Sequence, residues 1–386
     1  MANERRLPLN GITVVDMSQF LSGPYCSLRL LDLGARVIKV ERPDGGDLAR
    51  RLYLSDTEIG GDSTIFHAIN RGKESLAIDL KNPDDMAILR KLLGQADVMI
   101  QNFRPGVIQR LGLSYEEVRQ INPRLVYGSI TGYGTEGPWV KRPGQDLLAQ
   151  ARSGVMWLNG DESHGPVPFG LAVADMLAGA ALCQGLLAAL VGRGVTGEGE
   201  HVETSLLEAL VDLQFEVLTT HLNDGRRPPR RSDLRSAHAY LSAPYGVYPT
   251  ADGFIAIAMT PIGKLADLLG LETLEPFRDD SASWFTKRDE IKAILAAHLA
   301  TDTVANWRAL LEPADIWCAE VLDWPQLLDS EGFKALDMLQ TVTREDDVSI
   351  ETTKSPLRIS GQRSGIRTAA PRIGEHSATI RKDFAL

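Results

Sequence analysis

The sequence predicts an α/β protein, with a parallel sheet in its first half and a smaller α+β unit after it. In the first half, short apolar runs typical of buried strands alternate with helical patterns. This alternation favours right-handed crossover connections and therefore a parallel sheet. A proline-containing segment, Arg226–Arg231, breaks the rhythm, and a hairpin pattern follows it. A chain of 386 residues is long enough for two or three domains.

The first strand–helix–strand unit lies near the start of the chain. Gly11–Asp16 is an apolar run of the kind found in a buried strand. Ser22–Pro24 is expected to open a helix, because proline suits the first helical position. That helix should end at Leu33, before Gly34, and Ala35–Glu41 should form the next strand.

Three further strands are expected in the same sheet: Ser75–Asp79, Asp97–Gln101 and Leu125–Ile130. A helix over residues 82–93 should separate the first two of these strands. The sequence Ser114–Glu117 is a capping box, so another helix is expected before the third strand.

The second unit begins after the Arg226–Arg231 segment, in which two prolines forbid a continuous helix and predict a linker. Tyr245–Pro249 and Phe254–Ala258 form a hairpin pattern around a turn at Asp252 and Gly253. Helices are expected at 260–270, 287–299 and 304–311, with short strands and one last helix between 342 and 386.

The composition is that of an ordinary globular protein, with 44% hydrophobic and 24% charged residues. The net charge of −10 argues against nucleic acid as a partner, since nucleic-acid-binding domains usually carry a basic surplus. Cys26, Cys183 and Cys318 form no C-x-x-C pair and are expected to stay reduced. The N-terminal residues are polar, and the apolar stretch Leu171–Val191 is expected to be a buried helix. The sequence therefore predicts a cytoplasmic protein without a membrane partner.

Several familiar motifs are incomplete or misplaced. The loop Met17–Pro24 lacks the glycines that bind a dinucleotide, although Glu41 stands where a ribose-binding acid would sit. Gly192–Gly197 spells G-x-G-x-x-G, but it follows a helix and is expected to be a helix stop and turn. Gly128–Gly132 has isoleucine at the nucleophile position of a G-x-S-x-G elbow. The seven histidines are scattered, so no metal site is predicted.

Asp175 stands at the start of a helix rich in alanine, leucine and glycine. A carboxylate in the first turn faces the positive end of the helix dipole and stays ionised. Such a carboxylate can attack a thioester as a nucleophile. On these residues alone, however, a structural helix cap is the better interpretation.

A series of short motifs follows along the chain, and their fixed order is more specific than any one of them. They are Leu9–Asp16, Ser22–Pro24, Gly34–Pro43, Gly46–Asp47, Asn70–Lys73, Asp97–Gly106, Asn122–Arg124, Gly132–Gly134, Gly137–Pro138, Ala174–Asp175, Thr196–Gly199 and Gly374–His376. Together they resemble the class III CoA-transferases, the family that includes the CaiB/BaiF and formyl-CoA transferase-like proteins. The resemblance covers nearly the whole chain and is weakest between residues 225 and 339.

The resemblance implies that Asp175 is a catalytic nucleophile. In this family the carboxylate attacks the donor acyl-CoA and gives an aspartyl mixed anhydride and free CoA thiolate. The thiolate returns to make an aspartyl-CoA thioester, and the acceptor, expected to be a small carboxylic acid, leaves as its CoA ester. Backbone N–H groups would stabilise the tetrahedral oxyanions. Each intermediate keeps the free energy of a thioester, so neither ATP nor a tightly bound cofactor is implied.

The resemblance also implies a CoA site on the first domain, because guanidinium groups suit the geometry of phosphate. The residues expected to meet the phosphates are Arg42, Lys73, Arg104, Arg110 and Arg142. Those expected along the adenine and pantetheine path are Asn102, Phe103 and Leu111.

The expected architecture is a Rossmann-like large domain built from residues 1–225, to which a C-terminal segment, 336–386, returns. Residues 226–335 would form the small α+β domain. The resemblance further implies an interlocked homodimer in which each chain threads the other.

Two alternatives to transfer remain. Racemases of the same fold, which act on 2-methylacyl-CoA, use a His–Asp pair because a proton must leave one face of the α-carbon and return to the other. Here the corresponding residues are Gln145 and Asp146, and glutamine cannot exchange a proton at neutral pH. Leu21 replaces the glutamine of formyl-CoA transferases, and 236–245 lacks their glycine run, which argues against oxalate–formate exchange. The other alternative is a catalytically inactive CoA-binding homologue.

Overall fold

The computed structural model describes residues 7–54, 56–363, 365–366 and 368–386. The chain forms two compact units. The first comprises Met1–Ala149, Ala172–Leu213 and Leu336–Leu386, and the second comprises Gln150–Leu171 and Gln214–Ala335.

Residues 214–225, which the sequence prediction counted with the first domain, belong to the second unit. So do residues 150–171, which were also predicted to be part of the first domain. They are held there by Arg231, whose guanidinium donates to the carbonyl oxygens of His164 (2.6 Å) and Gly165 (3.2 Å). A long-range contact of this kind leaves no pattern in the local sequence.

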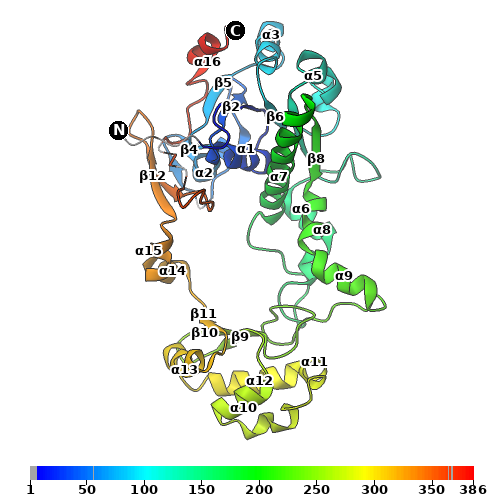
Figure 1. The fold of residues 1–386 in the computed structure, drawn as a ribbon, viewed down its shortest axis with the longest axis vertical. Helices are drawn as coiled ribbons and strands as arrows, with labels where there is room; N and C mark the ends of the chain where they lie inside the picture. The colour runs from blue at the N-terminus through cyan, green and yellow to red at the C-terminus, as the bar shows by residue number, and fades with distance from the viewer. Residues whose placement is uncertain (1–6, 55, 364, 367) are drawn as a thin grey trace. The chain divides into compact units, whose positions relative to one another are not determined.

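The first unit is built on a six-stranded parallel sheet (Figure 1). Its strands are β1 (Thr13–Asp16), β2 (Arg36–Glu41), β5 (Glu74–Ala77), β6 (Val98–Gln101), β7 (Val126–Thr131) and β8 (His201–Ser205). They lie in the order β5-β2-β1-β6-β7-β8, with every neighbouring pair parallel. The predicted α/β class with a parallel sheet is therefore confirmed, and the order is that of a doubly wound Rossmann-like fold.

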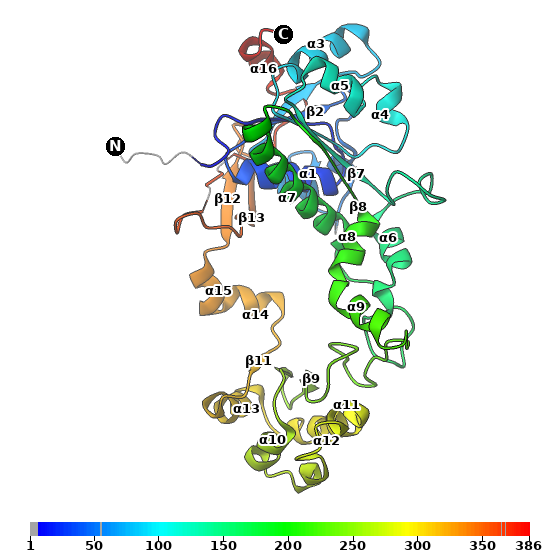
Figure 2. The same ribbon diagram turned by 45° about the vertical axis from the view of Figure 1, so that its right-hand side comes forward.

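Helices cover both faces of this sheet (Figure 2). On one face are α1 (Ser22–Asp32), α7 (Val173–Thr196) and α8 (Leu206–Leu213); on the other are α3 (Pro83–Leu93), α5 (Tyr115–Ile121) and α16 (Ser377–Asp383). Each face has its own apolar core, with Leu30 and Leu182 in the first and Leu89 and Leu92 in the second. Burial on both faces explains why the strands are continuous apolar runs.

Smaller elements complete the unit. They are β3 (Glu58–Ile59), β4 (Asp62–Ser63), α2 (Thr64–Asn70), α4 (Val107–Arg110), β12 (Leu339–Thr343) and β13 (Ser349–Thr353). Helix α6 (Asp146–Ser153) begins in this unit, and its residues from Gln150 onward belong to the second unit. The C-terminal residues lie along β5: the backbone N–H of His376 donates to Ser75 O (3.1 Å), and Ser377 Oγ accepts from Ala77 N (3.1 Å).

Helix α7 is long and apolar enough to cross a membrane by length and composition alone. Its buried residues, among them Ala178, Leu182 and Leu186, pack in the core against the sheet. A core helix passes the same test of length and composition, so α7 is weak evidence for a span. The motif Gly192–Gly197 ends this helix, with Gly197 in the left-handed conformation at φ 79°, as expected for a helix stop.

The second unit contains the predicted hairpin, formed by β9 (Gly246–Pro249) and β10 (Phe254–Ile257). A third antiparallel strand, β11 (Cys318–Glu320), was not predicted, because three mixed residues carry no strand pattern. The helices of this unit are α9 (Phe215–Asn223), α10 (Ile262–Leu269), α11 (Ser283–Thr286), α12 (Arg288–Leu299), α13 (Val304–Leu311), α14 (Trp324–Asp329) and α15 (Glu331–Leu336).

Candidate active site

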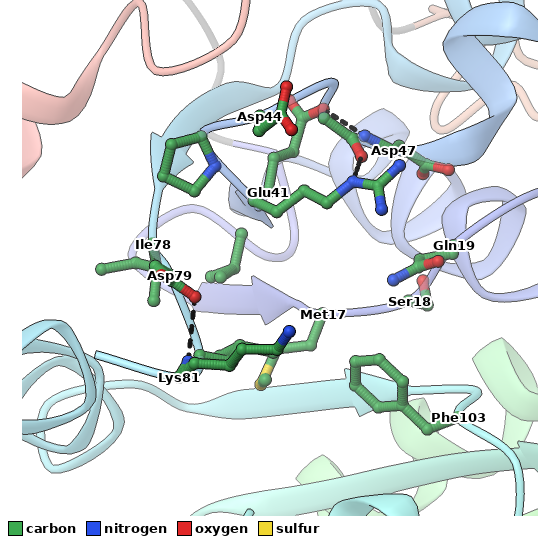
Figure 3. A pocket seen from close by; sticks show the side chains of 15 residues that line it. Met17, Ser18, Gln19, Glu41, Asp44, Asp47, Ile78, Asp79, Lys81 and Phe103 are labelled. Atoms are coloured by element: carbon green, nitrogen blue, oxygen red, sulfur yellow. Dashed lines mark hydrogen bonds between the residues drawn. The ribbon is translucent and has the colours of Figure 1, made fainter. Parts of the chain in front are cut away.

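The carboxyl ends of β1, β2, β5 and β6 meet at one edge of the sheet and surround a pocket of about 480 Å³ (Figure 3). Parallel sheets bind ligands beyond the carboxyl ends of their strands, where the strand order reverses. Here the order reverses between β1 and β6. The pocket is lined by Met17, Ser18, Gln19, Val40, Glu41, Arg42, Pro43, Asp44, Gly46, Asp47, Ile78, Asp79, Leu80, Lys81 and Phe103.

Two cationic side chains of the lining, Arg42 and Lys81, are exposed and form no ion pair with any residue that the structure describes. Arg42 Nε donates to Gly46 O at 2.9 Å, which orients its guanidinium. Glu41 differs, because Arg50 holds both of its carboxylate oxygens at 2.8 Å. The positive charge available to a ligand at this pocket therefore comes from Arg42 and Lys81.

A buried ion pair at the end of β1 supports the loop that follows this strand. Lys73 Nζ lies 3.0 Å from Asp16 Oδ2, and both side chains are fully buried. Lys73 also donates to Pro24 O at 2.9 Å, while Asp16 accepts from the Ser18 backbone (3.0 Å) and from Ser27 Oγ (2.5 Å). Burial lowers the pKa of Lys73 to about 8, whereas Lys73 and Lys39 outweigh burial and hold the pKa of Asp16 well below its usual range.

A second lysine supports the same loop. Lys39 Nζ lies 2.7 Å from Asp47 Oδ2 and donates to Ser18 O at 3.0 Å. Burial alone would lower the pKa of Lys39, but the carboxylates around it raise the pKa above its ordinary value. We call Asp16, Lys39, Asp47 and Lys73 the buried charge cluster. This cluster fixes the loop after β1, and its member Lys73 does not line the pocket.

Asn102, directly after β6, joins this loop to the neighbouring strand. Its Nδ2 donates to Gln19 O at 2.7 Å, and its Oδ1 accepts from Gln19 N at 2.8 Å. The same Nδ2 lies 3.4 Å from Ser22 Oγ, at the start of α1. Asn102 therefore couples the pocket residue Gln19 to Ser22.

Asp175 is the third residue of α7, and it lies next to Ser22. Burial, followed by the negative charge of Asp146, raises the pKa of Asp175 to about 6, and an interaction with the Ser22 hydroxyl partly opposes this. The Asp146 carboxylate accepts hydrogen bonds from the backbone N–H groups of Ala174 (2.7 Å) and Asp175 (3.2 Å). At neutral pH, Asp175 is thus a mostly ionised carboxylate that is more basic than one in water.

Gly179 allows α7 to approach the start of α1 this closely. A Cβ added at Gly179 would lie 2.4 Å from Ser22 O and 3.4 Å from Cys26 N, so only glycine fits. This close packing keeps Asp175, one turn earlier on α7, beside Ser22.

The predicted site residues divide into two groups. Arg42 and Phe103 line the pocket, and Asn102 adjoins it through Gln19. The predicted residues outside the lining are Lys73, Arg104, Arg110, Leu111 and Arg142. Of these, Lys73 is buried in its ion pair and Leu111 packs against the core, while the three arginines are exposed.

Sequence reasoning missed Lys81, Gln19, Ser22 and Asp146 as site residues. Lys81 follows β5 at the same edge of the sheet as Arg42 follows β2, so its position after a strand was a usable signal. The roles of Ser22 and Asp146 depend on contacts with α7 that are distant in sequence.

Within the described residues, no group of three or more His, Cys, Asp or Glu side chains could hold a metal ion. The three cysteines are free thiols.

Comparison with known proteins agrees with this arrangement. The model of CoA-transferase family III matches residues 9–377. The succinate–glutarate CoA-transferase of Agrobacterium fabrum is 33% identical over 97% of this chain and 95% of its own. The acetyl-CoA:oxalate CoA-transferase of Acetobacter aceti is 32% identical, over 98% and 96%. A crystal structure of a CaiB/BaiF family protein from Brucella suis has a TM-score of 0.86 and 31% identity, and the match covers 98% of this chain and all of that one. This enzyme belongs to CoA-transferase family III.

Proposed function

We propose that the enzyme moves coenzyme A from an acyl-CoA donor to a small carboxylic acid through covalent intermediates on Asp175. The observation that carries this proposal is the position of Asp175: a half-buried carboxylate in the first turn of α7, beside Ser22, with its pKa raised to about 6. Such a group is ionised at neutral pH, yet it is a better nucleophile than a solvated aspartate.

In the first half of the reaction, an Asp175 carboxylate oxygen attacks the thioester carbonyl of R–CO–S–CoA. The C–S bond breaks, and the products are a mixed anhydride, Asp175–CO–O–CO–R, and the thiolate CoA–S⁻. The thiolate then attacks the aspartyl carbonyl and expels R–COO⁻, which leaves Asp175–CO–S–CoA. No proton is consumed, and the energy of the thioester is retained.

In the second half, the acceptor R′–COO⁻ attacks the aspartyl thioester and releases CoA–S⁻ from a second mixed anhydride. The thiolate attacks the acceptor's carbonyl, which forms R′–CO–S–CoA and returns the Asp175 carboxylate. Catalysis needs the thiolate to stay in place throughout, so the enzyme must hold the rest of CoA firmly.

The pocket at the sheet edge is the proposed site for the nucleotide end of CoA. Arg42 and Lys81, the unpaired cations of its lining, are suited to the phosphates. The exposed carboxylates of Asp44 and Asp79 could accept hydrogen bonds from ribose hydroxyls or the adenine amino group. The segment from Gln19 to Ser22 connects this pocket with Asp175, which supports it as the path of the pantetheine arm.

The proposed acceptor is a small dicarboxylate. Two relatives, 33% and 32% identical to this chain, carry the names succinate–glutarate CoA-transferase and acetyl-CoA:oxalate CoA-transferase. The acids in these names, succinate, glutarate and oxalate, are small dicarboxylates. The choice among such acids needs a substrate panel.

The decisive experiment incubates the enzyme with a panel of acyl-CoA donors, including acetyl-CoA and succinyl-CoA, and adds hydroxylamine. Hydroxylamine cleaves activated acyl groups, so mass spectrometry should find a hydroxamate on Asp175, and Asp175→Asn should lose transfer by more than about a thousandfold. Transfer activity without any modification of Asp175 would overturn the proposal.

Racemisation is separated by running the same enzyme on a 2-methylacyl-CoA in D₂O. Gln145 is exposed and has no titratable group, so we expect no deuterium at the α-carbon. Incorporation at a rate comparable with CoA transfer would favour the racemase instead. A protein that binds CoA but gives neither adduct nor exchange would be the inactive homologue.

We also propose that the chain acts as a homodimer in the cytoplasm. Apolar side chains on α7 are strongly exposed, with Val191 at 74% and Val195 at 88%, and a second copy would cover them. Free thiols at Cys26, Cys183 and Cys318 suit a reducing compartment. Light scattering after size exclusion should give twice the mass of 42.2 kDa; a monomer at micromolar concentration would contradict the assembly.

A further inference from the structure

We propose that Asp146 is a positioning residue for Asp175: its carboxylate caps α7, and its negative charge repels the ionised nucleophile until acylation removes that repulsion. The inference rests on the proposed function, because it assigns Asp146 a part in the acylation of Asp175. Asp146 does not touch the reacting carbonyl in this account; it acts through Asp175 alone.

The cap is visible in the hydrogen bonds at the start of α7. The first N–H groups of a helix have no partner within the helix. Ala172, the residue at the cap position, has no side-chain acceptor. Asp146 Oδ2 supplies one from another segment and accepts from Ala174 N (2.7 Å) and Asp175 N (3.2 Å). The first turn of α7, which carries the nucleophile, is therefore oriented by Asp146.

The segment that carries Asp146 is itself fixed. Asp146 is the first residue of α6, and Gly144 before it passes directly over Gly132, which follows β7. A Cβ added at Gly132 would lie 2.7 Å from the Gly144 Cα, so the two backbones are in contact. Gly132 O also accepts from Leu207 N at 3.2 Å. Asp146 is thus anchored to the end of the central sheet rather than to a free loop.

The charge of Asp146 has a second effect. After burial, it is the next cause of the raised pKa of Asp175, which reaches about 6. The other titratable groups on elements packed against α7 are Tyr25, Cys26, Arg29 and Asp32 on α1, Tyr127 on β7, His201 and Glu203 on β8, and Glu208 and Asp212 on α8. Within the described part of the chain, none of these is among the causes of that shift.

Acylation of Asp175 removes its repulsion with Asp146. An ionised Asp175 faces the like charge of Asp146, whereas an acylated Asp175 is neutral and does not. The helix N–H groups that would otherwise stabilise the Asp175 carboxylate are directed to Asp146 instead. The resting carboxylate is therefore raised in free energy relative to the anhydride, and a more basic carboxylate is a better nucleophile.

Asp146→Asn separates the two effects, because asparagine keeps an oxygen acceptor for the cap but has no charge. We expect D146N to keep the wild-type KM for acyl-CoA and, because the repulsion is relieved, to melt at or above the wild-type temperature at pH 7. Its kcat should fall about tenfold, and the acid limb of kcat/KM should move to lower pH by about one unit. Asp146→Ala should lose both the cap and the charge. Glu136→Gln, which removes one exposed charge from the loop before α6, is the matched control and should behave as wild type.

Asp146→Glu provides a second variant that keeps the charge, so its acid limb should stay high even where kcat falls. The inference is overturned if D146N has the wild-type acid limb and kcat, or if D146E shifts the limb downward as far as D146N. These outcomes differ from failure of the proposed function, in which the wild-type enzyme itself would give no hydroxamate on Asp175 with any donor of the panel.

Discussion

Two carboxylates of the first unit, Asp16 and Asp175, lie in opposite electrostatic surroundings. In the buried charge cluster, Asp16 lies against Lys73 and Lys39, and its pKa falls. At the start of α7, Asp175 lies against another carboxylate, Asp146, and its pKa rises. The opposite charges around Asp16 keep its carboxylate ionised and fix the conformation of the loop. The like charge beside Asp175 favours any step, such as protonation or acylation, that makes this carboxylate neutral. The first arrangement suits support, and the second suits covalent chemistry.

The largest effect is expected from breaking the support. Lys73→Met leaves Asp16 in a fully buried site without its nearest cation, which should lower the free energy of unfolding by about 3 kcal/mol or more. Denaturant titration followed by circular dichroism measures this loss. Adding Asp16→Asn should recover part of it, because the unpaired charge is then gone. A K73M variant of wild-type stability with a raised KM for CoA esters would instead assign Lys73 to the phosphates.

Removing the charge of Asp175 should raise the free energy of unfolding, whereas the loss of Lys73 should lower it. The folded pKa of Asp175, about 6, exceeds the value of 3.8 for a solvated aspartate, so the folded state binds a proton more tightly between these pH values. Wild-type stability therefore falls as pH rises from about 4 to 6, and the penalty is fully present at pH 7. Asp175→Asn should be more stable than wild type at pH 7 by about 1–3 kcal/mol.

The same variant supplies its own control, since the gain should vanish near pH 3, where Asp175 is protonated in both folded and unfolded wild type. Thermal unfolding at pH 3.5 and pH 7 checks this. Equal stability of the two proteins at both values would show that the carboxylate is not strained.

A smaller effect is expected at the pocket rim. Lys81→Ala removes an exposed cation from the lining, so the KM for acyl-CoA should rise about tenfold, or about 1.4 kcal/mol, without a change in melting temperature. Lys91→Ala, an exposed lysine on α3 outside the lining, is the matched control. Equal KM values for the two variants would remove the nucleotide from this pocket.

The smallest effect is expected at Ser22, whose hydroxyl lowers the pKa of Asp175. Ser22→Ala should move the acid limb of kcat/KM to higher pH, opposite to the shift in D146N. The lost hydrogen bond to the carboxylate should be worth about 1 kcal/mol or less. The pH profiles of both variants, recorded side by side, test the direction. A downward shift in Ser22→Ala would mean that this hydroxyl does not stabilise the carboxylate.

Much of the large unit could be predicted because its signals are local. The strands that are buried on both faces, such as Val98–Gln101, are apolar runs that need no knowledge of their neighbours. The family resemblance placed Arg42 and Phe103 at a common site, and their positions after two strands that end at one edge of the sheet supported this. Asp175 was found through the order of motifs, since its own surroundings in sequence favoured a structural helix cap.

The remainder depended on pairings between distant residues. Lys73 and Lys81 both flank β5, and nothing nearby in the sequence says that the first is neutralised by Asp16 while the second faces the pocket. Asp146 likewise meets α7 across 28 residues of chain. Ionisation and helix capping across such separations are properties of the folded chain, so the periodicity of local segments cannot predict them.

The C-terminal residues along β5 have a consequence for handling the protein. β5 is an edge of the six-stranded sheet, and an uncovered edge strand is a template for pairing with another molecule. His376 and Ser377 occupy donors and acceptors of β5, and Ser75 Oγ accepts from Gly374 N at 2.9 Å. Removing residues 374–386 would expose this edge and would also uncover the apolar core to which Ile380 belongs. Such a truncated enzyme should aggregate on concentration, so expression tags belong at the other terminus.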